Sequence, residues 1–144
     1  MKEYVAGFLF SDTGYQVALI LKNRPDWQAG KFNAIGGRVE IENEETPDEA
    51  MRREFKEETG IDVTDWHEFA SLQDERGWLV RFYWATGKPW ECKRTTDEQP
   101  HVCFVSSLPE NIIPNLRWLI PMALSMKDER CDSFVIREFK ARAR

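Results

Sequence analysis

Residues 46–61, TPDEAMRREFKEETGI, constrain the fold more than any other stretch because they carry the signals that begin and end a helix. Thr46 is a good N-cap residue, and Pro47 suits the first helical position, where its missing N–H costs nothing. Gly60 is the residue type expected just past the end of a helix. The stretch therefore predicts a helix over residues 46–59.

Three glutamates of this helix lie on one side of it. Glu54, Glu57 and Glu58 are spaced i, i+3 and i+4, so their carboxylates project in a similar direction. Like charges at this spacing repel each other, and a hard divalent cation such as Mg²⁺, which prefers oxygen ligands, would relieve the repulsion. The alternative is a solvated face, which is the common role of a charge run on a helix. The helix is therefore either a metal-binding element or a charged surface.

The residues around the glutamates favour the metal-binding alternative. Their pattern resembles the signature of the Nudix hydrolases: Gly, five residues, Glu, seven residues and then R-E-U-x-E-E-x-G-U, where U is a bulky apolar residue. Residues 53–61, REFKEETGI, fit the second half at every defined position. In the first half, Gly37 precedes Glu45 by two residues more than the signature has, so residues 41–44 read as an insertion. The candidates for the first glutamate of the signature are Glu40, Glu42, Glu44 and Glu45.

The composition is that of an ordinary globular chain, with 42% hydrophobic and 31% charged residues among 144. We expect one domain over residues 1–144. No apolar run approaches the roughly 18 residues of a membrane helix, and the first ten residues lack the features of a signal peptide. We therefore expect a cytoplasmic protein with no membrane partner. The net charge of −5 and the lack of a basic block argue against binding to long nucleic acid.

The cysteines and histidines predict no metal site of their own. Cys92, Cys103 and Cys131 are odd in number and lack metal-site spacing, so we interpret them as free thiols. His101 and Cys103 would share one face of a strand. Two ligands without further partners are more typical of packing than of a zinc site.

Apolar patterns and turn signals predict the remaining elements. The expected strands cover residues 5–10, 15–22, 66–73, 78–86, 101–105 and 133–139, with a short strand within 31–35. A second helix is expected over residues 115–126, with Asn115 as its cap and a kink or a later start at Pro121. Residues 87–99 read as a long loop and residues 140–144 as a solvated tail.

This order of elements alone indicates a mixed α/β (α+β) domain with helices packed on a sheet. The Nudix resemblance implies more: an α/β/α sandwich with a mixed central sheet, in which the signature forms a loop–helix–loop on one side.

The resemblance also implies an activity, the hydrolysis of a nucleoside diphosphate linked to another group, with water attacking a phosphorus of the pyrophosphate bridge. Metal ions suit this reaction because they neutralise phosphate charge and lower the pKa of bound water. The implied cofactor is Mg²⁺, with Mn²⁺ as a substitute, and the implied partner is a nucleotide substrate.

Our leading hypothesis is a MutT-like enzyme that hydrolyses a (d)NTP, including a damaged or non-standard one, to a nucleoside monophosphate and pyrophosphate. One alternative is hydrolysis of a nucleotide sugar or a dinucleotide. The other is a non-catalytic nucleotide-binding module. For each, we expect either a monomer or a homodimer.

Individual residues take roles from the same resemblance. Glu54, Glu57 and Glu58 match the metal-binding glutamates of the family, and Arg53 matches the arginine that holds them in place. Gly37 matches the glycine whose carbonyl completes the metal site. These residues and one further carboxylate, from a distant loop, form the predicted catalytic and metal-binding set.

Glu98 is our choice for the further carboxylate. It lies in the run DEQP of residues 97–100 and is placed like the glutamate of the Glu-x-Gln-Pro run in the MutT-like branch, so we prefer it to Glu91 and Asp97. The alternative for Glu98 is a solvated loop acid. Either Glu57 or Glu98 can act as the general base, and the sequence does not decide between them.

Two asparagines are candidates for contacts with the base. Residues 31–37, KFNAIGG, resemble the G-x-x-N-x-x-G-G segment of MutT-like enzymes, in which the asparagine, here Asn33, reads the base. Asn115 falls in a run that resembles the start of their base-binding helix, at a position that often holds an acid. Its amide offers a donor and an acceptor, which would suit several bases. The alternative role of Asn115 is the helix cap.

The remaining substrate contacts are assigned by residue type. Lys22 and Arg24 lie at the end of the second expected strand and are candidates for the phosphates, or else are solvated. Trp118 and Trp27 can stack on a base, although aromatic side chains more often belong to the core.

Overall fold

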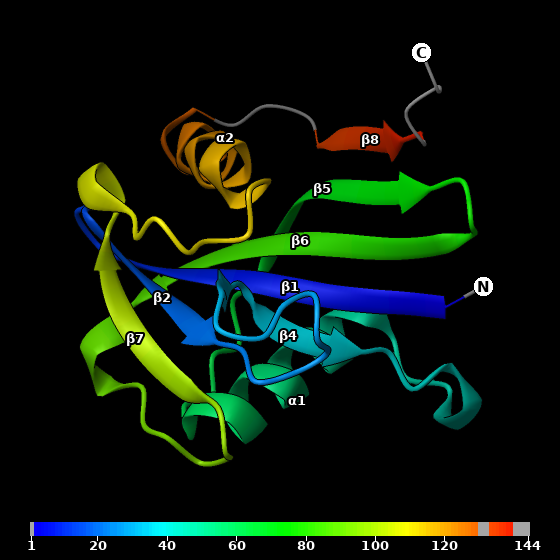
Figure 1. Ribbon diagram of the computed structural model, residues 1–144, viewed down its shortest axis with the longest axis horizontal. Helices are drawn as coiled ribbons and strands as arrows, with labels where there is room; N and C mark the ends of the chain where they lie inside the picture. The colour runs from blue at the N-terminus through cyan, green and yellow to red at the C-terminus, as the bar shows by residue number, and fades with distance from the viewer. Residues whose placement is uncertain (1, 130–132, 140–144) are drawn as a thin grey trace.

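Strand β1 (Lys2–Ser11) lies at the centre of a mixed sheet, and one helix covers each face of that sheet (Figure 1). The computed structural model describes residues 2–129 and 133–139. The further elements are β2 (Gln16–Leu21), β3 (Phe32–Asn33), β4 (Ile35–Arg38), η1 (Ile41–Asn43), α1 (Pro47–Thr59), β5 (His67–Asp74), β6 (Trp78–Gly87), η2 (Pro89–Glu91), β7 (Gln99–Phe104), η3 (Val105–Ser107), α2 (Leu116–Asp128) and β8 (Phe134–Glu138). The expected α/β/α sandwich with a mixed sheet is confirmed.

The pairing of β1 positions the segment that precedes α1. Along its whole length β1 pairs in parallel with β6, from Lys2 with Trp78 to Ser11 with Gly87. Its other edge is divided: β2 pairs with residues 9–10, and β4 pairs with residues 4–7. Both partners on this divided edge are antiparallel to β1. The chain between β3 and α1 is therefore fixed against the middle of the sheet.

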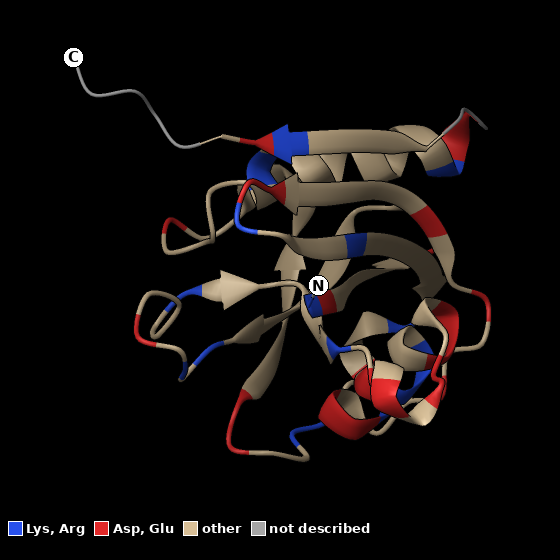
Figure 2. Ribbon diagram, turned by 90° about the vertical axis from the view of Figure 1, so that its right-hand side faces the viewer, with Lys and Arg blue, Asp and Glu red and all other residues tan. Residues whose placement is uncertain are grey.

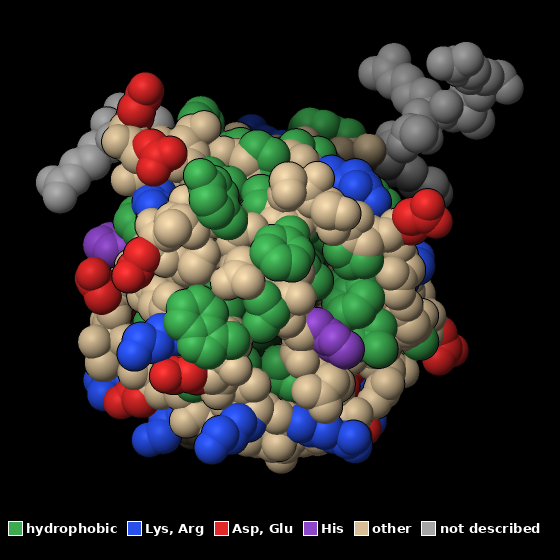
Figure 3. Space-filling model, turned by 90° about the vertical axis from the view of Figure 1, so that its left-hand side faces the viewer, with side chains coloured by type: hydrophobic (Ala, Val, Ile, Leu, Met, Phe, Trp, Pro, Cys, Tyr) green, Lys and Arg blue, Asp and Glu red, His purple; other side chains and the backbone are tan. Residues whose placement is uncertain are grey.

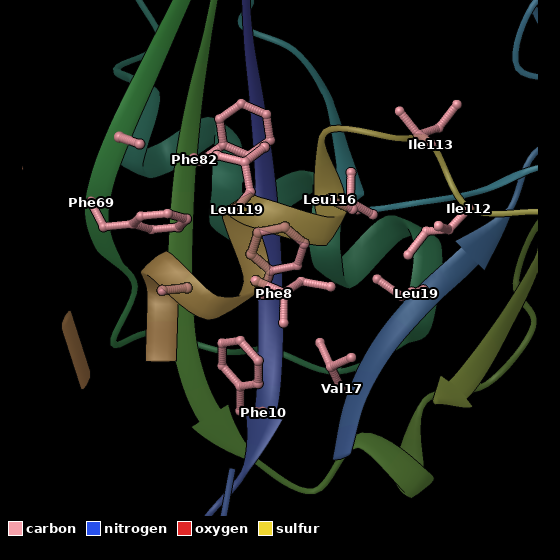
Figure 4. Close-up of a cluster of buried hydrophobic side chains, with 14 of the residues drawn as sticks. Phe8, Phe10, Val17, Leu19, Phe69, Phe82, Ile112, Ile113, Leu116 and Leu119 are labelled. Carbon is pink, nitrogen blue, oxygen red and sulfur yellow. The ribbon is translucent and has the colours of Figure 1, made fainter. Parts of the chain in front are cut away.

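The hydrophobic core has two parts, one on each face of the sheet. The part between the sheet and α2 is rich in aromatic rings, and Phe8 stacks on Phe82 with ring centroids 6.3 Å apart (Figure 4). The part between the sheet and α1 includes Met51, Phe55 and Tyr83. Successive side chains of a strand point to opposite faces, so β1 supplies both parts.

The expected helix over residues 46–59 is confirmed as α1, with Thr46 as its N-cap. Thr46 Oγ1 accepts a bond from the Glu49 N–H at 3.2 Å, and Glu49 Oε1 accepts one from the Thr46 N–H at 3.3 Å. This reciprocal pair satisfies donors that a helix start leaves free. At the other end Gly60 has a φ of 79°, which a residue without a side chain adopts easily. Local signals therefore define both ends of α1.

The second helix differs from its expectation in two respects. Helix α2 begins at Leu116, as expected, but the Asn115 side chain makes no capping hydrogen bond. Pro121 lies inside α2 on its exposed side and does not delay the start of the helix. A proline removes one backbone hydrogen bond, and the buried face of α2 outweighs this loss.

Strand β7 begins at Gln99, two residues before the expected strand, because Gln99 and Pro100 pair with Leu21 and Ile20 of β2. The expected tail over residues 140–144 lies outside the described residues, as does residue 131.

Strand β7 runs along the left-hand side of the molecule in Figure 1, and Figure 3 shows this side with hydrophobic side chains across its middle. Val102 and Phe104 of β7 are exposed. None of the helices within residues 2–129 and 133–139 combines the length and the apolar character that crossing a membrane would need.

We predict that Phe8→Ala lowers the free energy of unfolding by about 3–5 kcal/mol, because it opens a cavity among buried aromatic rings. Phe104→Ala is the matched control: this ring is 58% exposed, so the loss should stay within about 0.5 kcal/mol. Urea denaturation measures both. Equal losses for the two variants would contradict this placement of the core.

Candidate functional site

Arg53 of α1 joins three glutamates. Its guanidinium donates to Glu45 at 2.6 and 2.8 Å, to Glu54 at 2.9 Å and to Glu57 at 3.3 and 3.4 Å. A fourth partner is the backbone carbonyl of Arg38, at 3.1 Å. Two parallel bonds to one carboxylate make a strong and directional pair. The side chain therefore ties the loop before α1 to the helix itself.

Glu45 is the acid that pairs most closely with Arg53, and so it takes the place of the first glutamate of the signature. The Arg53 bond lowers the pKa of Glu45 and keeps its carboxylate charged. Glu40 lies 3.9 Å from the same guanidinium, and Glu42 pairs with Arg38 instead. The expected insertion at residues 41–44 folds mainly as the turn η1, which is exposed. The two additional residues thus bulge outward and leave Glu45 in register with Arg53.

Gly37 lies directly against the Glu54 carboxylate. A Cβ atom at position 37 would stand 2.3 Å from Glu54 Cδ, a distance that side chains do not adopt. Only glycine therefore lets the β4 backbone approach this carboxylate so closely. Burial raises the pKa of Glu54, and the charges of Glu57 and Glu58 raise it further, in opposition to Arg53.

Glu58 lies one turn further along α1, and its Oε2 accepts a bond from the Thr96 hydroxyl at 3.1 Å. Burial raises the pKa of Glu58, and so do the nearby charges of Glu98 and Glu57. Glu57 itself is exposed and turns toward Arg53. Figure 2 shows, in red on the ribbon, how aspartate and glutamate residues gather on α1 and the turn before it.

Glu98 is buried, with 4% of its surface exposed, although it lies in a loop. Lys22 Nζ donates to its Oε1 at 2.9 Å, and the Asn23 N–H donates to its Oε2 at 2.6 Å. Burial alone would raise the pKa of Glu98, but these two bonds outweigh it and the pKa is lowered. Glu98 is therefore a charged group held in place, and the solvated alternative is wrong.

The chemistry of this donor set fits a hard divalent cation. Burial and like charges destabilise the ionised forms of Glu54 and Glu58, and a bound cation would reverse both effects. Within residues 2–129 and 133–139, no three histidine, cysteine, aspartate or glutamate side chains are arranged to hold a metal ion. Arg53 and Lys22 draw the carboxylates toward themselves, so a cation would compete with these two side chains.

Glu54, Glu57 and Glu58 of α1 form an acidic cluster, and a pocket of about 560 Å³ adjoins it. Gly37 lines this pocket and also contacts the Glu54 carboxylate, so the two features share a wall. Three uncharged amide side chains, those of Gln28, Asn33 and Asn115, line it as well. The charged residues of the pocket wall are the basic Lys22 and Arg76, so the pocket itself offers positive charge and neutral groups that can donate and accept hydrogen bonds.

The two predicted base-contacting residues differ in their hydrogen bonds. Asn33 Nδ2 donates to Gln28 Oε1 at 2.9 Å, and its Oδ1 accepts from the Ala34 N–H at 2.8 Å. The Oδ1 atom of Asn115, in contrast, is buried and has no hydrogen-bond partner. A buried acceptor without a partner costs free energy, typically about 1–3 kcal/mol. This orphaned atom belongs to a residue of the pocket wall.

The structure brings only some of the predicted substrate contacts together. Lys22 lines the pocket, whereas Arg24 lies on the surface beside Asp97. Trp118 is 41% exposed and is not part of the pocket wall. The other side of α2 faces the core, so Trp118 points away from it. Trp27 lines the pocket instead.

Sequence reasoning missed Gln28 and Thr96. Gln28 lies in a loop with no periodicity, and nothing in its surroundings marks it. Thr96 reaches Glu58 across 38 positions of the chain, and such a contact carries no local signal.

Comparison with known proteins identifies the family. The family model of the NUDIX domain matches residues 1–130, so the chain belongs to the Nudix hydrolase family. No curated protein matches the sequence.

Many solved structures share the fold. A MutT NUDIX hydrolase from Burkholderia pseudomallei is 19% identical, with 84% of this chain and 96% of that chain covered and a TM-score of 0.71. An ADP-ribose pyrophosphatase from Streptococcus suis is 17% identical, with 96% and 98% covered and a TM-score of 0.72. The NUDIX domain of Shewanella oneidensis NrtR, complexed with ADP ribose, is 18% identical, with 87% of each chain covered and a TM-score of 0.69. At these identities the likeness establishes the fold alone.

We predict that Gly37→Ala lowers kcat about a hundredfold, because the new Cβ displaces the Glu54 carboxylate by an ångström or more. The fold should persist, since the displaced atoms end a flexible side chain. Gly36→Ala is the contrasting variant: its Cβ would lie 1.9 Å from the Val5 carbonyl oxygen, so stability should fall by about 1–3 kcal/mol or more.

Steady-state kinetics and thermal unfolding of the two glycine variants separate the effects. A Gly37→Ala variant with the kcat of the wild type would show that the position of Glu54 is unimportant for turnover.

Proposed function

We propose that this protein is a Mg²⁺-dependent nucleoside triphosphate pyrophosphohydrolase. One water molecule is added to the substrate, which yields a nucleoside monophosphate and pyrophosphate. The observation that carries this proposal is the wall shared by the acidic cluster and the pocket, in which Gly37 contacts the Glu54 carboxylate. A nucleotide whose base occupies the pocket would place its phosphates beside the glutamates.

In this proposal, Glu54, Glu57, Glu58, Glu98 and the Gly37 carbonyl would hold the cation once the carboxylates turn toward it from Arg53 and Lys22. When bound, Mg²⁺ neutralises charge on the phosphate oxygens and lowers the pKa of a coordinated water. Mn²⁺, which also takes oxygen ligands, is expected to substitute.

The side chains of the protein orient these ligands and the substrate. Arg53 fixes the direction of Glu54 through the 2.9 Å bond and is itself anchored by Glu45. Lys22 lies between Glu98 and the pocket, where its ammonium group can pass from the carboxylate to a substrate phosphate. Glu98 and Glu57 both remain candidates for the group that accepts the proton of the attacking water.

The amide groups support a nucleotide base as the occupant of the pocket. The unpartnered Asn115 Oδ1 would accept a hydrogen bond from an N–H group of the base, and this bond would remove a buried unsatisfied acceptor. Asn33 is held by Gln28 and the Ala34 N–H, so its amide is oriented before the ligand arrives. Trp27 lines the same pocket, where its ring would stack on the base.

A second candidate function is hydrolysis of ADP-ribose or another nucleoside diphosphate derivative. Two of the structures with this fold are an ADP-ribose pyrophosphatase and a domain complexed with ADP ribose. Binding without turnover is the third alternative. The complete set of glutamates in the signature favours catalysis over this alternative.

One phosphate-release assay distinguishes the three functions. The purified protein is incubated with Mg²⁺ and a panel of NTPs, dNTPs, ADP-ribose, nucleotide sugars and dinucleoside polyphosphates. Pyrophosphate from an NTP yields inorganic phosphate only when inorganic pyrophosphatase is added. ADP-ribose and nucleotide sugars instead yield two phosphomonoesters, from which only alkaline phosphatase releases phosphate.

We expect phosphate release from at least one NTP in the pyrophosphatase arm. The NTPs are left out of the alkaline phosphatase arm, because that enzyme removes phosphate from them directly. Release from ADP-ribose or a nucleotide sugar in that arm, with none from any NTP in the pyrophosphatase arm, would overturn the triphosphate proposal in favour of the second function. Nucleotide binding without phosphate release in either arm would favour the third alternative, binding without turnover.

We predict that Glu58→Gln lowers kcat by at least about a hundredfold, because it removes a charge that would hold the metal. Thermal unfolding should change little. Glu44→Gln, in the exposed insertion, is the matched control and should keep the kcat of the wild type. A near-normal rate for Glu58→Gln would remove this residue from the metal site.

We predict that Asn115→Leu raises KM for the preferred nucleotide about tenfold, the equivalent of one lost hydrogen bond. Thermal stability should not fall, because the substitution also removes an unsatisfied buried acceptor. Trp118→Leu is the control outside the pocket and should leave KM unchanged. If Asn115→Leu keeps both KM and base preference, Asn115 does not contact the base.

A further inference from the structure

The loop between β6 and β7 is attached to the C-terminal end of α1. The Lys93 N–H donates to the Thr59 carbonyl at 2.9 Å. The Thr95 hydroxyl donates to the backbone carbonyl of Glu57. These two contacts bring the loop to the side of α1 that carries Glu58.

Thr96, the next residue, joins two of the proposed metal ligands. Its Oγ1 lies 3.1 Å from Glu58 Oε2 and 3.1 Å from the backbone nitrogen of Glu98. The Glu98 N–H donates to this oxygen, so the single hydroxyl proton of Thr96 is free for another acceptor. Two acceptors lie within reach of this proton, the Glu58 carboxylate at 3.1 Å and the Glu98 carbonyl oxygen at 3.5 Å. The Glu58 carboxylate is both nearer and more negative, so the hydroxyl donates to it.

Glu98 is fixed at its other end by the two residues that follow β2. Lys22 Nζ and the Asn23 N–H hold one carboxylate oxygen each. A continuous series of hydrogen bonds therefore runs from Glu58 through Thr96 and Glu98 to the end of β2. It connects a carboxylate on a helix with one on a loop, 40 positions later in the chain.

We propose that Thr96 is a positioning residue that sets the separation and orientation of Glu58 and Glu98 for metal binding. This inference rests on the proposed function. A hydroxyl at this position restrains both carboxylates before a cation arrives, which lowers the entropic cost of binding it. If Thr96 instead served only to shape the loop, its contact with the Glu98 N–H would matter and its contact with Glu58 would not.

The test compares four variants of the full-length protein with the wild type. Thr96→Val keeps the shape and removes the hydroxyl, and Thr96→Ser restores the hydroxyl. Thr96→Ala repeats the loss if the valine variant does not fold. Thr95→Val is the matched control, because it removes a neighbouring hydroxyl that bonds to a backbone carbonyl and to no carboxylate.

Three quantities are measured for each variant. Electron paramagnetic resonance titration gives the affinity for Mn²⁺ alone, without substrate. Steady-state kinetics gives kcat and KM for the best nucleotide, and thermal unfolding gives stability.

We expect Thr96→Val to bind Mn²⁺ about tenfold to a hundredfold more weakly, since supporting partners of metal ligands have effects of this size. Its kcat should fall by a similar factor while KM for the nucleotide stays the same. Thr96→Ser should recover most of the affinity, and Thr95→Val should match the wild type in Mn²⁺ affinity whatever its stability.

Wild-type Mn²⁺ affinity and kcat in Thr96→Val would overturn the inference and leave the proposed function intact. Equal losses of Mn²⁺ affinity in Thr96→Val and Thr95→Val would also overturn it, because the effect would then come from the loop as a whole. A wild type that binds no Mn²⁺ and hydrolyses no nucleotide would overturn the proposed function, and the inference with it.

Discussion

The positive charge of Arg53 makes the acidic arrangement of α1 compatible with folding. Glu54, Glu57 and Glu58 repel one another, and the burial of two of them adds a cost that water would otherwise remove. Arg53 offsets part of this cost through bonds to Glu54 and Glu57, and Glu45 fixes the guanidinium from the other side. Lys22 likewise offsets part of the cost of burying the Glu98 carboxylate, through its hydrogen bond to Oε1. The remaining imbalance, centred on Glu58, would favour a divalent cation at this position, as proposed above.

The sheet determines where this charge is located. The divided edge of β1 allows β4 to run beside it, and this pairing carries Gly37 to the Glu54 carboxylate. The same stretch of chain contributes Asn33 and Gly37 to the pocket wall. Fold, acidic cluster and pocket are thus linked through one short segment. This segment requires glycine at two positions. The Val5 backbone lies too close to Gly36 for a side chain there, and the Glu54 carboxylate lies too close to Gly37.

The sequence predicted most closely those features that depend on local signals. The N-cap threonine and the C-terminal glycine defined α1, and the spacing of three glutamates identified their common side. The insertion before Glu45 was also predicted, but the choice among four glutamates required the Arg53 contact. The early start of β7 was missed because Gln99 and Pro100 are strand residues only by virtue of pairing with β2. Thr96 and Gln28 were missed because their partners are brought to them by the fold.

The position of Trp118 outside the pocket wall has a different cause. Leu116, Leu119 and Ile120 are buried, so a helical period of 3.6 turns position 118 away from the core and from the pocket wall. The pattern of apolar residues already contained this information. Burial of Glu98, in contrast, depends on Lys22 and the Asn23 N–H, more than 70 positions earlier in the chain, and no local pattern could have predicted it.

The central claim is that these carboxylates form a site for a divalent cation that acts together with a nucleotide. Calorimetric titration of the wild-type protein with Mg²⁺, in the presence and absence of a non-hydrolysable NTP analogue, tests it most directly. The account predicts Mg²⁺ binding that the analogue strengthens, because phosphate oxygens supply further ligands and compete with Glu98 for Lys22. Absence of Mg²⁺ binding under both conditions would contradict it.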